Sequence, residues 1–106
     1  MTPQAMVKHI ELWLIDTLVP YGRNPRTHSD TQIAQIAASI SEFGFNSPIL
    51  VDTTNGIIAG HGRLLAARKL GLTEVPVIVL DHLSEAQKRA YIISRLINRL
   101  WRKRRT

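Results

Sequence analysis

The fold of this chain is decided by residues 56–76, which read GIIAGHGRLLAARKLGLTEVP. The stretch begins with an apolar pair, residues 57–58, that predicts a short strand. Two glycines then flank His61, and a helix-forming run continues up to Gly71, a residue type that commonly ends helices. Residues 75–80 read as a second, buried strand despite one proline. The stretch therefore predicts a strand, a tight turn, a helix and another strand in succession.

The turn made by Gly60, His61 and Gly62 has the composition of an anion-binding site. Glycines let the backbone approach a ligand closely, and the helix that follows directs N–H groups and its positive dipole end toward the turn. Arg63 adds a planar fork of donors suited to a phosphate. The alternative is a glycine-bent connection between strand and helix, in which Arg63 points into water. Both interpretations stay open on the residues alone.

Size and composition indicate one small domain. The chain has 106 residues, of which 44% are hydrophobic, and no apolar run approaches the roughly 20 residues of a membrane span. The first residues lack a charged segment leading into an apolar one, so no secretory signal is expected and we predict a cytoplasmic protein. The absence of cysteine excludes disulfides, thiolate metal sites and cysteine nucleophiles.

The formal net charge of +6 is concentrated at one end of the chain. Residues 1–87 contain six Lys/Arg and all eight Asp/Glu, a net of −2, whereas residues 88–106 contain eight Lys/Arg and no acid, a net of +8. We therefore divide the chain into a domain over residues 1–93 and a basic extension over residues 94–106. The run Arg102-Lys103-Arg104-Arg105 is either a solvated end or a contact for DNA phosphates that would weaken with salt.

The remaining pattern alternates strands and helices. Residues 9–15 and 49–51 are rich in strand formers, and residues 52–56 form a turn between the latter strand and residues 57–58. Residues 16–28 contain several breakers of regular structure and predict a loop. The fold class expected is a small, single-domain, mixed α/β (α+β) protein of about four strands and three helices.

Two helices besides the one after Gly62 are predicted from capping boxes. Ser29 and Gln32 open a helix that Gly44 ends, and Ser84 and Gln87 open another. The apolar positions expected along these helices are Ile33, Ile36, Ala37, Ile40 and Phe43 in the first, Leu64, Ala67 and Leu70 in the one after Gly62, and Ala86, Ala90, Ile93 and Ile97 in the last.

Five ordered segments resemble the ParB/sulfiredoxin superfamily, specifically its ParB-like nuclease domains of stand-alone or methylase-linked type. They are YGRNPR at residues 21–26, IAASISEFGF at 36–45, PILVD at 48–52, IAGHGR at 58–63 and GLTEVP at 71–76. The resemblance covers residues 10 to 93 and implies a ParB/sulfiredoxin-like fold. Such domains are encoded by bacteria, phages and plasmids.

The resemblance also implies a pocket for a nucleotide or a phosphate. ParB binds and hydrolyses CTP there, and sulfiredoxin binds ATP and carries a catalytic cysteine that this chain lacks. Carried over by position, the phosphate-binding residues would be Gly60, His61, Gly62 and Arg63, approached by Asn24 and Arg26 from the preceding loop, while Ser39 and Gly44 would line the nucleoside side.

Three departures from the family pattern bear on catalysis. His61 stands where ParB proteins commonly have an acid, and Gly62 where they have a second arginine. In ParB a Glu-Asn pair in the last helix helps to hold magnesium, whereas this chain has no acid after Glu85. Hard cations prefer carboxylate oxygens, so we expect no magnesium ligand there. The four histidines lie without acids at metal-ligand spacing, and no zinc site is expected.

Three functions follow as hypotheses. The leading one is a ParB-like domain that binds a nucleoside triphosphate (CTP or ATP) or a phosphate and acts in DNA transactions. The second is a nuclease or NTPase, a hydrolase of the same fold with His61 and Arg63 as catalytic residues, since a histidine changes charge near neutral pH. The third is a non-catalytic protein-interaction module. A homodimer is compatible with each, and no membrane association is expected.

Overall fold

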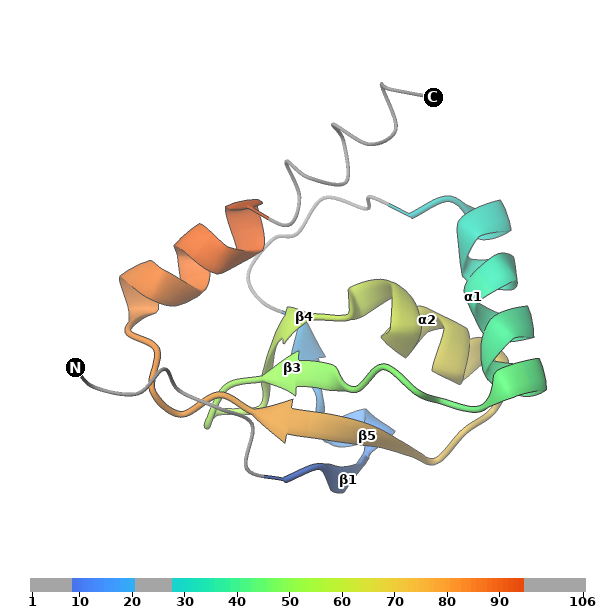
Figure 1. Ribbon diagram of the computed structural model, residues 1–106, viewed down its shortest axis with the longest axis horizontal. Coiled ribbons are helices and arrows are strands. Elements are labelled where there is room, and N and C mark those ends of the chain that lie inside the picture. The colour runs from blue at the N-terminus through green and yellow to red at the C-terminus, as the bar shows by residue number, and fades with distance from the viewer. Residues whose placement is uncertain (1–8, 21–27, 95–106) are drawn as a thin grey trace.

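The computed structural model describes residues 9–20 and 28–94 of the chain, and these form a curled, five-stranded mixed sheet with three helices (Figure 1). The strand order is β1-β5-β3-β4-β2. The strands are β1 (Glu11–Leu14), β2 (Val19–Pro20), β3 (Ile49–Val51), β4 (Gly56–Ala59) and β5 (Glu74–Val79). The mixed α/β fold class expected from the sequence is confirmed.

Parallel and antiparallel pairs alternate across the sheet. β1 pairs with β5 antiparallel, β5 with β3 parallel, β3 with β4 antiparallel, and β4 with β2 parallel. The register sets Leu12 opposite Pro76 and Ile49 opposite Val77. β1 and β2, which are joined only by the short 3-10 helix η1 (Ile15–Thr17), consequently lie at opposite edges of the sheet.

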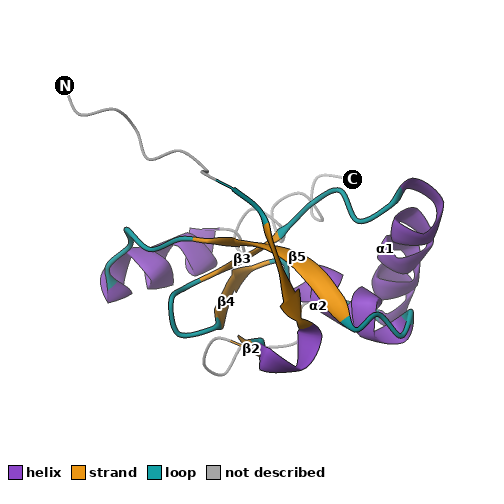
Figure 2. Ribbon diagram, turned by 90° about the horizontal axis from the view of Figure 1, so that it is seen from below, coloured by secondary structure: helices purple, strands orange, loops and turns teal. Residues whose placement is uncertain are grey.

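The helices occupy two ends of the molecule (Figure 2). α1 (Asp30–Phe43) packs on α2 (His61–Lys69) at one end, and residues 85–94 are helical at the other. Both predicted capping boxes are present: Gln32 N–H donates to Ser29 Oγ at 3.1 Å, and Gln87 N–H donates to Ser84 Oγ at 3.1 Å. α1 ends at Gly44, as predicted, with a φ of 91°.

The main core lies between the sheet and α2. Leu64 and Ala67 of α2 belong to one buried cluster with residues of β3, β4, β5 and η1, whose members are Ile15, Leu18, Ile49, Val51, Ile57, Leu64, Ala67, Val75 and Val77. A second, smaller cluster joins Ile33 and Ala37 of α1 to Ala66 of α2. α2 is therefore held from both sides, which fixes the position of its first turn.

Three details differ from the sequence predictions. β2 lies within the segment 16–28 that was predicted to be a loop. It forms because Val19 N–H donates to Asn55 O, and local sequence patterns do not reveal a bond between residues so far apart in the chain. Leu70 and Phe43 are exposed rather than packed, since each lies at the last turn of its helix. In the helix at residues 85–94, Ala86, Ala90 and Ile93 are exposed, and the positions turned inward are Lys88, Tyr91 and Ile92.

Among the described residues, no helix is both long enough and apolar enough to cross a bilayer.

Candidate functional site

The predicted glycine turn forms the start of α2. Gly60 is the N-cap residue, with a φ of 104° and a ψ of 21°, and it makes no side-chain capping bond. Leu64 N–H donates to Gly60 O at 3.0 Å and closes the first helical turn. The N–H groups in the first turn of any helix have no acceptor within that helix, and they carry the positive end of its dipole. The two other helices begin instead with serine caps.

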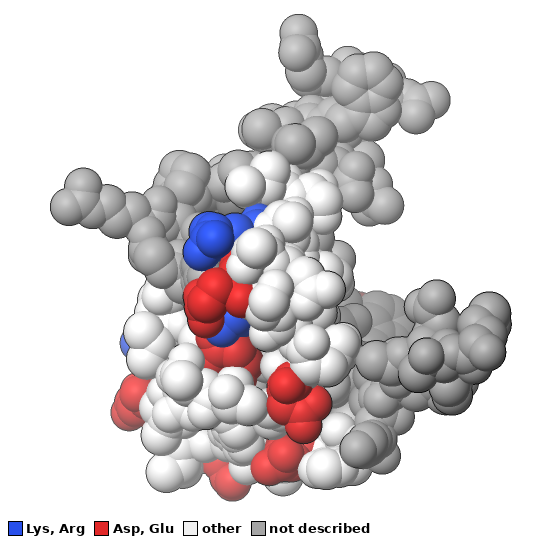
Figure 3. Space-filling model, turned by 90° about the vertical axis from the view of Figure 1, so that its left-hand side faces the viewer, with Lys and Arg blue, Asp and Glu red and all other residues white. Residues whose placement is uncertain are grey.

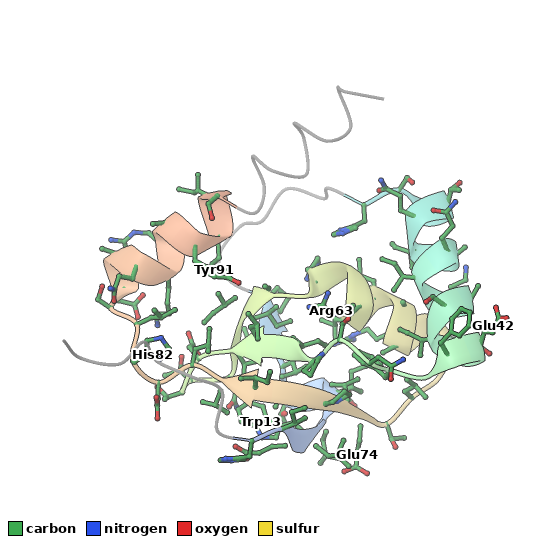
Figure 4. The ribbon with its side chains drawn as sticks, viewed as in Figure 1. Trp13, Glu42, Arg63, Glu74, His82 and Tyr91 are labelled. Carbon is green, nitrogen blue, oxygen red and sulfur yellow. The ribbon has the colours of Figure 1, made fainter. Side chains whose placement is uncertain are left out.

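Arg63 is folded back across the start of α2 toward β3 (Figure 4). Its Nη2 donates to Pro48 O at 3.0 Å, and a Cβ placed on Gly60 would lie only 2.9 Å from the same nitrogen. The side chain is half-buried and its Nε is buried. The alternative in which Arg63 merely points into water is therefore wrong. The guanidinium holds the loop before β3 against the glycine turn, and this bond uses one of its five N–H donors.

His28 is a neighbour of this turn that the sequence did not single out. A Cβ placed on Gly62 would lie 2.7 Å from His28 Nε2, so the imidazole lies directly against the glycine. The sequence signal that could have found it is the capping box at Ser29. This box fixes how the chain enters α1, and α1 packs on α2. His28, the residue just before the cap, therefore lies close to the start of α2.

His61 is the first residue of α2. The residue is half-buried and its Nδ1 is a buried atom, so His61 is not a fully solvent-exposed turn residue. Its assignment as a catalytic residue, like that of Arg63, stays a prediction.

The other predicted site residues lie around or beyond this turn. Ser39 is exposed on α1, and Gly44 caps the C-terminal end of that helix. The loop that begins at Gly44 ends at Pro48, whose carbonyl accepts the bond from Arg63, so this loop does reach the glycine turn. Asn24 and Arg26 lie outside the described residues, as do Arg102, Lys103, Arg104 and Arg105.

A second polar cluster lies where the helix of residues 85–94 meets the turn between β3 and β4. Asp52 Oδ1 accepts from Thr54 N at 2.9 Å, Thr54 Oγ1 at 2.8 Å and Gly56 N at 2.8 Å, while its Oδ2 accepts from Lys88 Nζ at 3.1 Å. Lys88 also contacts Glu85 Oε1 at 2.5 Å. The sequence predicted only a turn here and missed the buried ion pair, which joins residues far apart in the chain.

The electrostatics of this cluster favour both charges. Burial raises the pKa of Asp52, but hydrogen bonds from Gly56, Thr54 and Lys88 outweigh it and hold that pKa below its ordinary value of 3.8. The hydrogen bond to Glu85 raises the pKa of Lys88 above 10.5; burial opposes this shift and Asp52 adds to it. Asp52 and Glu85 are thus engaged by a lysine. Within residues 9–20 and 28–94 no three His, Asp or Glu side chains come together as a metal site.

The described part of the chain carries little positive charge. It contains five Lys/Arg and all eight Asp/Glu, a net of −3, because most of the basic residues fall outside it. Figure 3 shows acidic side chains scattered over one end of the molecule, with basic ones confined to a smaller area beside them. The described residues form no broad basic surface on this face of the kind that tracks a DNA backbone.

Comparisons with known proteins agree with this architecture. The ParB-like nuclease domain-containing protein YnaK of Escherichia coli K12 is 50% identical over 74 residues, which are 70% of this chain and 85% of that protein. The probable plasmid-partitioning protein ParB of Deinococcus radiodurans is 40% identical over 78 residues, 70% of this chain but only 27% of its own length. The chain thus spans about a quarter of that partitioning protein.

Solved structures show the same fold. The C-terminally truncated chromosome-partitioning protein ParB of Caulobacter crescentus, complexed with CTP-γ-S, superposes with a TM-score of 0.69 at 29% identity, over 83% of this chain and 53% of that one. Sulfiredoxin of Arabidopsis thaliana superposes with a TM-score of 0.67 at 18% identity, over 80% of this chain and 98% of that one, a likeness of fold alone.

The family assignment follows from the extent of the match. The sequence profile of the ParB N-terminal domain covers residues 2–96, which include the whole sheet and all three helices as described. The chain therefore belongs to the ParB N-terminal domain family and is related to chromosome- and plasmid-partitioning proteins.

Proposed function

We propose that this chain binds a nucleoside triphosphate through its phosphates at the first turn of α2. One observation carries the proposal: α2 begins at a left-handed glycine with no side-chain cap, so its dipole end and first N–H groups are turned toward a compact, glycine-lined turn. The Caulobacter ParB structure with bound CTP-γ-S, at 29% identity, supports a nucleotide as the ligand.

Each residue near the turn has a distinct proposed role. Gly60 and Gly62 bring Arg63 and His28 against the main chain at the proposed phosphate site, because a Cβ at either position would lie closer than 3.0 Å to one of these side chains. Arg63 keeps the loop before β3 in place and sets its positive charge beside the proposed phosphate site. Asn24 and Arg26 would add contacts from the preceding loop, and Ser39 and Gly44 would lie on the nucleoside side.

The proposed binding proceeds without efficient hydrolysis. Magnesium-assisted phosphoryl transfer needs a metal held across adjacent phosphates and a positioned water. No acid follows Glu85 in the sequence, and Asp52 is already bonded to its own turn and to Lys88. A domain that keeps the glycine turn but lacks a carboxylate for the metal is expected to retain affinity and lose rate.

The biological setting proposed is a DNA transaction of the partition or regulation type. A Caulobacter ParB relative, 26% identical, has been crystallised with its centromeric parS site. In this chain we assign DNA contact to Arg102, Lys103, Arg104 and Arg105, since the described residues carry a net charge of −3. Such contacts bind phosphates and do not read sequence.

Calorimetry with CTP, ATP and GTP, with and without magnesium, tests the proposal. Arg63→Ala is expected to weaken the binding of the preferred nucleotide by about 1.5–3 kcal/mol, because a charge-assisted bond to phosphate is lost. Arg68→Ala is the matched control, since Arg68 is exposed in the last turn of the same helix. Unfolding curves of both variants separate lost affinity from lost stability.

The outcomes distinguish the three functions. Magnesium-dependent phosphate release by the wild-type protein that His61→Ala abolishes would contradict the proposal and favour the NTPase or nuclease. A failure of all three nucleotides to bind would leave the protein-interaction module. Equal losses of affinity in Arg63→Ala and Arg68→Ala would place the ligand elsewhere than the start of α2.

A further inference from the structure

We propose that β1 is a self-association edge, at which two copies of this chain pair their β1 strands antiparallel about Leu12. The proposal concerns a surface on the far side of β5 from β3, and it does not depend on nucleotide binding. β1 lies at one end of the strand order, and among the described residues its only strand partner is β5 (Figure 1).

The hydrogen-bond pattern shows which backbone groups of β1 face outward. Ile15 N–H donates to Thr73 O at 2.9 Å, which continues the register that sets Trp13 opposite Val75. In an antiparallel ladder, directly opposed residues alternate between pairs that exchange both hydrogen bonds and pairs that exchange none. Leu12 therefore falls in a pair that exchanges none, which agrees with its partner Pro76, a residue without an N–H. The N–H and C=O of Leu12 consequently point away from β5.

The same alternate residues carry exposed apolar side chains. Ile10, Leu12 and Leu14 are 57%, 66% and 59% exposed and lie on one face of the strand, beside the half-buried Pro76 of β5. The outward backbone groups and the outward apolar stripe thus belong to the same three residues. Leu14 O already accepts from Thr17 Oγ1 at 2.7 Å, and a carbonyl has a second lone pair.

A second copy of β1 matches this edge both in its outward backbone hydrogen-bonding groups and in its exposed apolar side chains. With a two-fold axis at Leu12, each Leu12 exchanges both bonds with its counterpart, and Ile10 of one copy exchanges them with Leu14 of the other. The apolar stripes then meet on one face of the joined sheet. On the other face Glu11, which accepts from Trp13 Nε1 at 3.3 Å within one copy, lies opposite the second copy's Trp13.

The two edges of this sheet are built differently. Soluble proteins usually blunt edge strands with proline, lysine, bulges or very short length. β2 at the opposite edge has only two residues, and one of them is Pro20. β1 has no proline, glycine, lysine or bulge between Ile10 and Leu14. Within residues 9–20 and 28–94, β1 is thus the edge without these protective features, as a strand used for pairing must be, and β2 is the edge that has them.

The oligomeric state of the full chain in solution tests the interface. Light scattering over a concentration series is expected to show a dimer. Leu12→Lys places two like charges directly opposite each other across the interface, and it should raise the dissociation constant of the dimer at least about tenfold. Phe43→Lys is the matched control, because Phe43 is similarly exposed, at 68%, but lies at the end of α1. A monomeric wild type, or a dimer that Leu12→Lys leaves intact, would overturn the proposal.

Disulfide trapping tests the register independently, because the chain has no cysteine of its own. Opposed residues of an antiparallel pair lie about 5.5 Å apart between Cα atoms, within disulfide reach. Leu12→Cys should therefore form an interchain disulfide under mild oxidation, whereas Leu14→Cys, displaced from its own counterpart along the strand, should not. Equal trapping of both variants, or of neither, would contradict antiparallel pairing about Leu12.

Discussion

Gly60 combines a left-handed backbone with two close neighbours. Its φ is 104°, and a Cβ would lie 2.9 Å from Arg63 Nη2 and 3.2 Å from Ile49 Cα. Gly71 also has a positive φ, 74°, but nothing lies within 4 Å of its Cβ position. Substitution of Gly60 therefore introduces both backbone strain and crowding, whereas substitution of Gly71 introduces backbone strain alone.

We expect Gly60→Ala to destabilise the fold by about 1–3 kcal/mol through strain and crowding together. Gly71→Ala should cost only about 1 kcal/mol, because strain acts there alone. Urea unfolding of both variants measures the difference. Equal losses would indicate that the contacts with Ile49 and Arg63 carry no energy of their own.

Asp52 should make stability depend on pH at the acid end. Because its pKa in the folded protein is below 3.8, its carboxylate contributes stability fully above that value, and the contribution is lost as pH falls through the folded pKa. The raised pKa of Lys88 acts in the opposite sense: its contribution is complete below 10.5 and is lost as pH rises through the folded pKa.

Removal of Asp52 tests this dependence. Asp52→Ala should cost about 2–4 kcal/mol at neutral pH, because Thr54 and Gly56 lose an ionised acceptor. The stability gap between wild type and Asp52→Asn should be constant between about pH 5 and 9 and should shrink below 3.8. Denaturant unfolding across pH measures it, with Asp81→Asn as an exposed-charge control. A gap that persists in strong acid would contradict an ionised Asp52.

Features of the site that depend on neighbouring residues could be predicted from the sequence, but contacts between residues far apart in the chain could not. The turn at Gly60 was predictable because glycine permits the left-handed backbone found there, whereas His61 and Gly62, predicted as part of the turn, are the first two residues of α2. The bond from Arg63 to Pro48 joins residues 15 apart, and that between Lys88 and Asp52 joins residues 36 apart. Side chains that act at such range leave no periodic signal. His28 was missed for the same reason.

At the scale of elements, the start of α1 is determined by its N-terminal capping box. Ser29 Oγ accepts from Gln32 N, and Gln32 Oε1 accepts from Ser29 N–H at 2.9 Å. Both bonds follow from residues three apart, which is why sequence predicted this helix start. β2 was missed because a two-residue parallel strand ending in Pro20 has no pattern of its own and depends on the bond from Val19 to Asn55.

The cap at Ser29 should be worth about 1 kcal/mol of stability, so Ser29→Ala is expected to lose that amount. Ser39→Ala is the matched control within α1, because Ser39 is exposed in the helix interior, where alanine is the better helix former. Thermal and urea unfolding compare the two. If Ser39→Ala were as destabilised as Ser29→Ala, the loss of stability would come from removing a serine hydroxyl anywhere in the helix and not from removing the cap.

At the scale of the whole molecule, charge is divided between a slightly acidic body and a basic end. Deletion of residues 102–106 removes four positive charges. If these residues contact DNA, the slope of log affinity against log salt should become less steep by up to roughly four. Filter binding or fluorescence anisotropy over a salt series measures it. Arg68→Ala with Lys69→Ala is the control on the body, and an unchanged slope in the deletion would assign the contact to the body.

The strand order β1-β5-β3-β4-β2 also has a consequence for synthesis on the ribosome. β1 is among the earliest elements to leave the exit tunnel, yet its neighbour β5 is the last strand to emerge. The nascent chain must therefore carry Trp13 and Ile15, which pack in the main core of the folded domain, without their sheet while nearly all of the domain is translated. Exposed apolar strands of this kind are where chaperones bind and where nascent chains on one polysome associate.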